Sequence, residues 1–420
     1  MAHPVRAGRL WRAGAGYATG MTAIEPWHRA LADLLSLSHR LPPDQLPVAV
    51  NDALRPLGAA VTVYLVDAEQ RDLRPLPERG RPTPDPLPID SSLAGRAFTQ
   101  VEVHAGQGPP PRLWVPVVDG TDRLGLLEVF PPAGTDLADE GVRDGCRLVS
   151  GMVGHLVTSK GTHGDTLHRT RRSRPMGVSA ELLWQLLPPL TFAAWDTTVS
   201  ALLEPCYEVG GDAFDYAVDG GVVALAILDG VGHGLPAVLT TSVALAALRA
   251  ARRTGSDLPG LVRAVDAAIA AQWRDARFVT AVLAEFDTDT GLLRYVNAGH
   301  PPPVLLRRGR AVQALDGGRR LPLGLPDDRV DVAETRLEPG DRLLLHTDGV
   351  TEARDPAGEM FGLPRLADLA ERHIGSGLPA PEILRRLSHA VVGHQAGPHQ
   401  DDATLMLLEW SAAAAARTQP

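Results

Sequence analysis

Aspartates beside glycine, or beside another aspartate, recur at expected strand edges in the second half of the sequence. They are Asp212 in EVGGDAF, Asp229 in AILDG, Asp348 in LHTDG and Asp401 in DDATLM. Carboxylates at the ends of several strands can converge, and hard oxygen donors of this kind suit Mg²⁺ or Mn²⁺ rather than Zn²⁺. One Asp-Gly pair is only a common turn, so the number and order of these positions carry the inference.

Two other chemistries fit parts of the same stretch. GGDAF differs by one residue from the Gly-Gly-Asp-Glu-Phe turn of cyclic-dinucleotide cyclases, and GVGHG could cradle a phosphate after a strand. A cyclase needs Glu where Ala213 stands and leaves Asp215 unexplained. A dinucleotide cradle needs neither Asp229 before its glycines nor the later Asp348. The carboxylate interpretation is therefore favoured over both.

The elements that must position these residues fall in residues 195–412. Strand-like runs recur there, and helical patterns cover 235–253, 258–273 and parts of 363–393. Many strands with paired helices predict a β-sandwich flanked by helices instead of an alternating, doubly wound sheet. The overall fold class expected is α+β.

Residues 25–160 predict a separate α/β unit. Helical patterns precede a strand pair, and a proline-rich loop, a short helix capped by serine, a hairpin at 112–130 and a closing helix follow. This order, with GRAF, RLWVPVVDG and RLGLLEVF, resembles a GAF sensor domain. The resemblance implies a small-ligand site or a dimerisation module, and we expect an unidentified ligand and a homodimer.

Residues 161–194 are expected to be a linker. The basic run at 169–174 has no interleaved aromatic residues, so it predicts a solvated surface and not nucleic-acid binding. An amphipathic helix is expected from Ser179, as N-cap, to Leu187, stopped by two prolines. Its leucine face would pair across a dimer and couple the two domains.

In residues 204–410 the chain resembles the type 2C metal-dependent serine/threonine protein phosphatases, in their bacterial sporulation (SpoIIE-like) branch. The stretches that carry the resemblance, in the family's order, include EPCYEVGGDAFDY, LAILDGVGHGLPA, FVTAVLAEFDTDTGLLRYVNAGHPPPVLL, LEPGDRLLLHTDGVTEARD and DDATLMLLEW. The resemblance implies an α-β-β-α sandwich, two Mn²⁺ or Mg²⁺ ions and hydrolysis of phosphoserine or phosphothreonine by a metal-activated water. It further implies a phosphorylated anti-anti-sigma factor of the STAS type as the substrate.

Roles follow by position. Asp229 would bridge two metals, with the Gly230 carbonyl on the second metal, and Asp348 and Asp401 would complete the first. Asp212 would support the second metal, with Asp215 beside it.

Other positions are weaker matches. Asp402 stands where the family often has Asn, and for Asp215 and Asp402 local turn hydrogen bonding is an open alternative. Val231 replaces a histidine of animal-type members. His233 is a candidate general acid, although a structural role at the helix start is favoured. His300 in NAGHPPP is expected to be structural, and Arg277 is proposed as a phosphate contact.

The bulk properties are consistent with a cytoplasmic signalling enzyme. The 420 residues allow two domains, the net charge of -9 argues weakly against nucleic acid, and the two cysteines form no metal pattern or disulfide framework. No apolar run reaches the ~20 residues that span a bilayer. Residues 1–24 and 413–420 are expected to be disordered ends. The rival hypothesis is a catalytically inactive GAF and phosphatase-fold dimeric scaffold.

Overall fold

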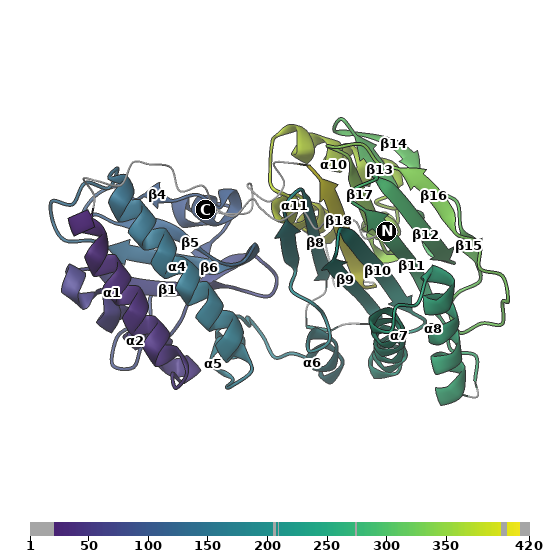
Figure 1. Ribbon diagram of the computed structural model, residues 1–420, viewed down its shortest axis with the longest axis horizontal. Helices are drawn as coiled ribbons and strands as arrows, with labels where there is room; N and C mark the ends of the chain where they lie inside the picture. Colours follow the sequence, from purple (N-terminus) through teal and green to yellow (C-terminus); the bar gives the residue numbers. More distant parts are fainter. Residues whose placement is uncertain (1–20, 205–206, 209, 274, 396–400, 412–420) are drawn as a thin grey trace, which may run out of the picture.

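The computed structural model describes residues 21–204, 207–208, 210–273, 275–395 and 401–411, and it contains an N-terminal unit and a C-terminal β-sandwich (Figure 1). Among these residues the chain is mixed α+β, as expected. Helix α1 begins at Met21, inside the segment expected as a disordered arm. The expected disordered tail, 413–420, and most of that arm, 1–20, lie outside the described residues.

The N-terminal unit is an antiparallel sheet with the strand order β3-β2-β1-β6-β5-β4. Its strands are β1 (Ala60–Val66), β2 (Asp72–Pro75), β3 (Leu87–Pro88), β4 (His104–Ala105), β5 (Leu113–Asp119) and β6 (Asp122–Phe130). Its helices are α1 (Met21–Ser38), η1 (Pro43–Gln45), α2 (Leu46–Leu54), η2 (Arg55–Leu57), α3 (Leu93–Gln100) and α4 (Glu140–Gly161).

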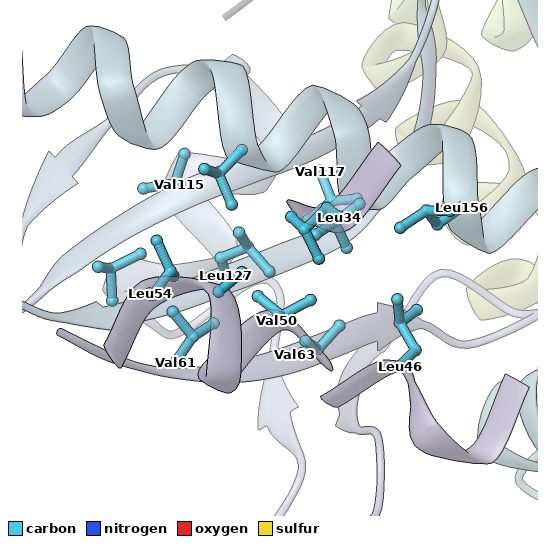
Figure 2. Close-up of a cluster of buried hydrophobic side chains, with 14 of the residues drawn as sticks. Leu34, Leu46, Val50, Leu54, Val61, Val63, Val115, Val117, Leu127 and Leu156 are labelled. Carbon is cyan, nitrogen blue, oxygen red and sulfur yellow. The ribbon is translucent and has the colours of Figure 1, made fainter. Parts of the chain in front are cut away.

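Alternation along the strands fills both faces of this sheet. On β1, Val61 and Val63 point into a core shared with α1, α2 and α4 (Figure 2), whereas Tyr64 and Val66 pack with α3 on the opposite face. Ser92 caps α3 as expected, since its hydroxyl accepts a hydrogen bond of 2.9 Å from the Gly95 amide.

The connecting segment contains α5 (Thr166–Thr170) and α6 (Val178–Trp184). The expected helix from Ser179 to Leu187 is wrong at both ends. Gly177 is the N-cap, without a side-chain cap bond, and the chain leaves the helix after Trp184 because Pro188-Pro189 soon follow. Its leucine face packs on the core of the following domain, and Leu183 is fully buried there. Leu183 is thus covered within one chain, whereas Leu182, Leu186 and Leu187 are only partly buried, and the expected pairing of this face across a dimer stays a prediction.

The C-terminal sandwich consists of two stacked sheets, as the strand runs predicted. One has the order β15-β12-β11-β10-β9, with β16 pairing β12, and the other has the order β14-β13-β17-β18-β8-β7. The first sheet contains β9 (Asp212–Asp219), β10 (Val222–Gly230), β11 (Val279–Asp287), β12 (Leu292–Ala298), β15 (Arg319–Arg320) and β16 (Ala333–Arg336). The second contains β7 (Thr191–Ala194), β8 (Thr197–Glu204), β13 (Val304–Arg307), β14 (Arg310–Ala314), β17 (Arg342–His346) and β18 (Ala403–Trp410).

Helices cover both outer faces of the sandwich (Figure 1). α7 (Leu235–Arg253) and α8 (Leu258–Gln272), together with α6, lie on the first sheet, and their bounds match the helices expected at 235–253 and 258–273. α9 (Asp348–Thr351), α10 (Leu363–Gly375) and α11 (Ala380–Gln395) lie on the second. A third apolar core, which includes Phe214, Phe286 and Met406, fills the space between the sheets.

By length and composition α7 could cross a membrane. Its buried residues, among them Val238, Leu245 and Leu248, belong to the core under the first sheet. The helix therefore has the packing of a core helix.

Candidate metal centre

The predicted carboxylates come from the ends of strands in both sheets of the sandwich. Asp212 and Asp229 lie opposite each other on the neighbouring strands β9 and β10 of the first sheet. Asp348 begins α9 just after β17, and Asp401 precedes β18, so both belong to the second sheet. A site built from all four would therefore join the two layers.

Glycine allows the backbone to approach closely at this edge. A Cβ atom on Gly349 would lie 1.8 Å from the carbonyl oxygen of Asp402, and one on Gly230 would lie 2.3 Å from the Thr241 hydroxyl. A side chain at either position would push β18 or α7 away from the carboxylates. The glycines after Asp229 and Asp348 are thus required by packing, independently of any ligand.

Asp229 is the electrostatic centre of the group. Burial raises the pKa of Asp229 to about 7, and the negative charges of Asp348 and Asp401 add to this rise. Asp401 is exposed as a residue, but its carboxylate is partly desolvated, and this desolvation together with the nearby Asp348 charge raises its pKa as well. Negative charge is therefore concentrated at this edge, which a divalent cation would relieve.

Asp212 lies deeper, with a relative exposure of 2%. The Thr347 hydroxyl donates a hydrogen bond of 2.7 Å to Asp212 Oδ2, and the Thr404 amide donates one of 2.9 Å to the Thr347 hydroxyl. Burial raises the pKa of Asp212 well above its usual value, and the charge of Asp229 acts in the same direction. Thr347 thus connects a carboxylate of the first sheet to β18 of the second.

Asp402 binds the glycine turn before β9. Its carboxylate accepts hydrogen bonds from the amides of Gly210 at 2.6 Å, Gly211 at 2.7 Å and Asp212 at 3.1 Å. Such a ring of amides satisfies an acidic side chain without a metal. This geometry favours the turn-bonding alternative left open by the sequence, and it fixes the position of Asp212.

The structure does not bring Asp215 together with the other carboxylates. Asp215 Oδ1 accepts a hydrogen bond of 2.7 Å from Arg249, and Oδ2 accepts one of 2.8 Å from Arg252. Arg249 also donates to the backbone oxygen of Leu186, just after α6. Asp215 is therefore placed as a buried ion-pair partner between β9, α7 and the linker, and this favours a structural role over metal ligation.

The two candidate histidines differ in their surroundings. His233 is exposed just before α7, and it lies near enough to Asp401 to offset part of the rise in the pKa of Asp401. His300 is buried, and its Nδ1 atom lies 2.8 Å from the Thr280 hydroxyl. Burial and the neighbouring His346 lower the pKa of His300 to about 3, so its ring is neutral. Arg277 is near the start of β11 and pairs with Asp275 at 3.2 Å.

Sequence reasoning missed the threonines that orient the carboxylates. Thr280 is the register partner of Asp229 on β11, and its hydrogen bond to Asp229 opposes part of the rise in the pKa of Asp229. A hydroxyl has one proton, so Thr280 can donate to Asp229 only if it accepts from His300 Nδ1–H. The position of Thr280, directly across the sheet from Asp229, was a signal that strand pairing could have supplied.

The donor atoms at this edge are carboxylate and backbone oxygens, which are the ligands that Mn²⁺ and Mg²⁺ prefer. The negative charges of the carboxylates repel one another, and a bound cation would reduce this repulsion. Within the part of the chain that the structure describes, no three His, Cys, Asp or Glu side chains are arranged to hold a metal ion. The donors therefore fit such ions by type, while a complete ligand shell requires the two sheets to adjust or water to fill positions.

The larger cavity is elsewhere. It measures about 840 Å³ and lies between β6, the linker helices and the start of β7, with Asp67, Arg123, Arg171, Trp184 and Leu190 among its lining residues. A second cavity of about 480 Å³ lies by α3 and β5 in the N-terminal unit, and Arg96 and Trp114 line it. The carboxylate edge belongs to neither of these two cavities.

Residues 219–411 match the family model described as Stage II sporulation protein E (SpoIIE). The phosphoserine phosphatase RsbU of Bacillus subtilis (strain 168) is 27% identical over 212 residues, covering 50% of this chain and 62% of the relative. The phosphoserine phosphatase RsbP of the same organism is 28% identical over 210 residues, covering 48% of this chain and 49% of the relative.

A crystal structure of the RsbU and RsbW domains of Rv1364c from Mycobacterium tuberculosis is 30% identical, with a TM-score of 0.43. It covers 51% of this chain and 61% of that structure. All three alignments thus span less than two thirds of the relatives' own length.

Proposed function

We propose that the chain is a metal-dependent protein serine/threonine phosphatase. The observation that supports the proposal is the placement of Asp229, Asp348 and Asp401 at one edge of a two-sheet sandwich, near enough that the charges of Asp348 and Asp401 add to the rise that burial causes in the pKa of Asp229, to about 7. These three residues fall within the segment that matches the SpoIIE family model, and two relatives are named phosphoserine phosphatases.

In this proposal, Asp229, Asp348 and Asp401 would hold one divalent ion. Asp212 and the Gly230 carbonyl would support a second ion, together with Asp229. When bound, a pair of Mn²⁺ or Mg²⁺ ions supplies an acidic water and neutralises the phosphoryl oxygens. Thr347 and Thr280 keep Asp212 and Asp229 turned toward the site, and Asp402 holds the turn that carries Asp212.

The leaving serine oxygen needs a proton, which solvent or His233 can deliver. His233 is exposed and lies near Asp401, so it can reach a substrate bound at this edge. His300 is excluded from this role because it is buried and neutral behind Thr280. We keep His233 as a candidate acid whose loss costs less than the loss of a ligand carboxylate.

The test is hydrolysis of a phosphoserine protein by the full chain, before and after chelation, with Mn²⁺ or Mg²⁺ then added back. We expect turnover to vanish with excess chelator and to return with either ion. Turnover that persists through chelation would rule out the two-metal proposal.

We propose further that the substrate is a phosphorylated anti-anti-sigma protein of the STAS type. This follows from the family resemblance, and the exposed residues Asp401 and His233 at the edge can be reached by a folded protein. The comparison is dephosphorylation of such a protein against an unrelated phosphoserine peptide at equal concentration. Equal kcat/KM for the two would remove the substrate assignment while leaving the phosphatase intact.

The N-terminal unit is proposed to be a GAF-type sensor that binds a small ligand and forms homodimers in the cytoplasm. Its support is the order of its elements and the cavity of about 480 Å³ beside α3. Sedimentation of the full chain tests the dimer, and a monomer at micromolar concentration would exclude it.

The incomplete ligand arrangement favours one rival, a catalytically inactive scaffold with the phosphatase fold. Calorimetric titration with Mn²⁺ separates the two proposals. An inactive scaffold would bind no Mn²⁺ at the carboxylates, whereas the phosphatase binds Mn²⁺ and loses that binding when Asp229 is changed to Asn.

A further inference from the structure

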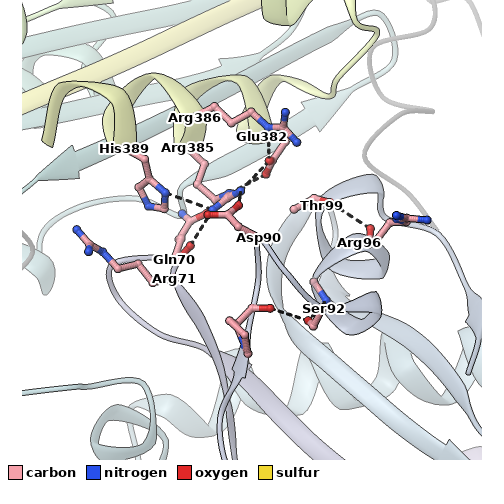
Figure 3. Close-up of polar contacts among 12 residues, drawn as sticks. Gln70, Arg71, Asp90, Ser92, Arg96, Thr99, Glu382, Arg385, Arg386 and His389 are labelled. Carbon is pink, nitrogen blue, oxygen red and sulfur yellow. Dashed lines mark hydrogen bonds and ion pairs between the residues drawn. The ribbon is translucent and has the colours of Figure 1, made fainter. Parts of the chain in front are cut away.

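A buried cluster of charges joins the N-terminal unit to helix α11 of the sandwich (Figure 3). We call it the α11 ion cluster and define it as Gln70, Asp90 and Arg123 of the N-terminal unit with Glu382 and Arg385 of α11. Arg123 Nη1 donates to Glu382 Oε2 at 3.2 Å, and Arg385 Nη1 donates to the backbone oxygen of Gln70 at 3.2 Å. Arg385 also donates to Asp90.

Apart from Asp90, which lies at its exposed rim, the cluster is shielded from water. The side chains of Glu382 and Arg385 are 0% and 1% exposed, and that of Arg123 is 4% exposed. Arg123 also lies over the Phe98 ring, 4.6 Å from its centroid, which fixes the guanidinium in place. A buried carboxylate needs its partners in good geometry, because water is not there to replace them. The N-terminal unit therefore supplies a bond that Glu382 cannot recover from solvent.

Helix α11 transfers this contact to the second sheet. Ile383, Leu384 and Leu387 pack with β8 and β18 residues such as Leu202 and Leu405. β18 starts just after Asp401 and Asp402, and only residues 396–400 separate the end of α11 from Asp401 in the chain. A shift of α11 would thus move the strand that carries one half of the candidate metal centre.

The linker contacts the helices that cover the first sheet, which carries Asp212 and Asp229. α6 packs against α7, and Arg249 of α7 bonds both to the chain end of α6 and to Asp215 on β9. The N-terminal unit is consequently connected to the first sheet by the linker that contains α6, and it contacts α11 on the second sheet directly. Because the four carboxylates are divided between these two sheets, their spacing depends on both contacts.

We propose that Arg123, Glu382 and Arg385 are positioning residues for the metal centre, through which the N-terminal unit holds β18 and Asp401 in a metal-binding arrangement. This inference rests on the proposed function, since it deepens the regulation of the same site. Arg123 and Gln70 also line the cavity of about 840 Å³ between the units. The contact is therefore local and polar, and a change in the N-terminal unit can alter it without unfolding a shared core.

The test is the Mn²⁺ affinity of full-length variants, measured by calorimetry and by the Mn²⁺ concentration that gives half-maximal turnover. Arg123→Met keeps the apolar stem but removes the bond to Glu382. We expect it to raise both the Mn²⁺ dissociation constant and the half-maximal concentration at least about fivefold, the lower range of ordinary coupling between sites.

Arg112→Met is the matched control. Arg112 likewise lies over a phenylalanine ring, Phe130 at 5.4 Å, and pairs with a glutamate at 2.8 Å, but that partner, Glu128, belongs to the N-terminal unit. We expect Arg112→Met to leave the Mn²⁺ constants within about twofold of the wild type. An equal shift in both variants would show only general damage to the N-terminal unit, and it would overturn the proposal.

Asp90→Asn gives a second measurement if Arg123→Met does not fold. Asp90 is 69% exposed in its side chain, so the substitution removes a charge from Arg385 at little cost to folding. We expect a smaller rise in the Mn²⁺ dissociation constant in the same direction. A constant equal to that of the wild type in Asp90→Asn and in any folded Arg123→Met would overturn the proposal.

The two readouts separate this inference from the proposed function. If the Mn²⁺ dissociation constant shifts as expected but neither the wild type nor any variant shows turnover, the positioning role is retained and the phosphatase proposal is rejected. Turnover with Mn²⁺ constants identical across all variants would retain the phosphatase and reject the positioning role.

Discussion

Thr280 lies between a buried histidine and the carboxylate that would bridge two metals. It pairs across the sheet with Asp229, and His300 Nδ1 lies 2.8 Å from its hydroxyl. Because His300 is neutral and buried, it can only orient this hydroxyl, and the hydroxyl orients Asp229. A single residue of the β11 strand thereby links the NAGHPPP segment to the site.

Thr280→Val tests this link. The substitution keeps the β-branched shape but removes the hydrogen bond, and we expect Mn²⁺ affinity to fall about tenfold, equivalent to ~1.4 kcal/mol, a typical net value for a bond to a charged group. Thr280→Ser should restore the affinity. If calorimetry gives Thr280→Val the Mn²⁺ constant of the wild type, Thr280 serves only the strand.

The carboxylates themselves separate into proposed metal ligands and ion-pair partners. Asp229→Asn and Asp348→Asn should abolish turnover and leave the unfolding transition in place, because each removes a ligand charge from the edge. His233→Ala should lose less activity. A loss from His233→Ala as large as that from Asp229→Asn, measured as kcat with a phosphoserine protein, would make His233 the acid.

Asp215→Asn should behave in the opposite way. It leaves Arg249 and Arg252 without their buried partner, so we expect the free energy of unfolding to fall by about 3–5 kcal/mol. Mn²⁺ affinity should change less than in Asp229→Asn. Denaturant unfolding and Mn²⁺ titration of the same sample give both values. A strong loss of Mn²⁺ binding without a loss of stability would show that Asp215 is a metal ligand after all.

At the scale of elements, α6 connects the linker to the first sheet through its leucine face. Leu183 is fully buried against α7 and β9, whereas Leu186 is only partly buried. Leu183→Ala should therefore destabilise the sandwich by about 2–5 kcal/mol.

Leu186→Asp places a charge at the edge of this packed face, beside the backbone oxygen that Arg249 binds. We expect it to change turnover and Mn²⁺ affinity together while the sandwich stays folded. Activity against Mn²⁺ concentration for the wild type and Leu186→Asp is the measurement. Superimposable curves would make α6 a tether only.

The helices and strands differ in how much local sequence specified them. The ends of α7 are marked by Gly234 and by the basic residues Arg252 and Arg253, so its bounds could be predicted. The start of α6 could not, because Ser179 offers a good cap that the chain leaves unused one residue inside the helix. There, packing on α7 overrides the local signal.

The same limit applies to the site. Asp229, Asp348 and Asp401 stand beside turn residues in a recognisable order, and the structure brings their charges together. Thr280 and Thr347 look like ordinary β-branched strand residues, and only the pairing of distant strands gives them a role. Arg123 and Glu382 are further apart still, and no local pattern predicts their contact.

At the scale of the whole molecule, the candidate metal centre lies at the junction of two sheets that separate cores hold in place. The first sheet packs against α6, α7 and α8, and the second packs against α9, α10 and α11. Ions shared by Asp229 of the first sheet and by Asp348 and Asp401 of the second would therefore fasten the layers together. Metal binding should then appear as stability of the sandwich and not only as activity.

Mn²⁺ at about 100 times its dissociation constant should stabilise the sandwich by ~2.7 kcal/mol, since it binds only the folded state. For a unit of this size, the thermal transition should rise by roughly 5–10 °C. The measurement is calorimetric unfolding of the full chain with and without Mn²⁺, and Asp229→Asn is the control that should show no rise. The transition of the N-terminal unit, where separate, should move less because it gains only through the α11 ion cluster. If Mn²⁺ raises the transition temperature equally in the wild type and in Asp229→Asn, the stabilising ion binds elsewhere on the molecule. The two sheets would then be held together by their shared apolar core alone.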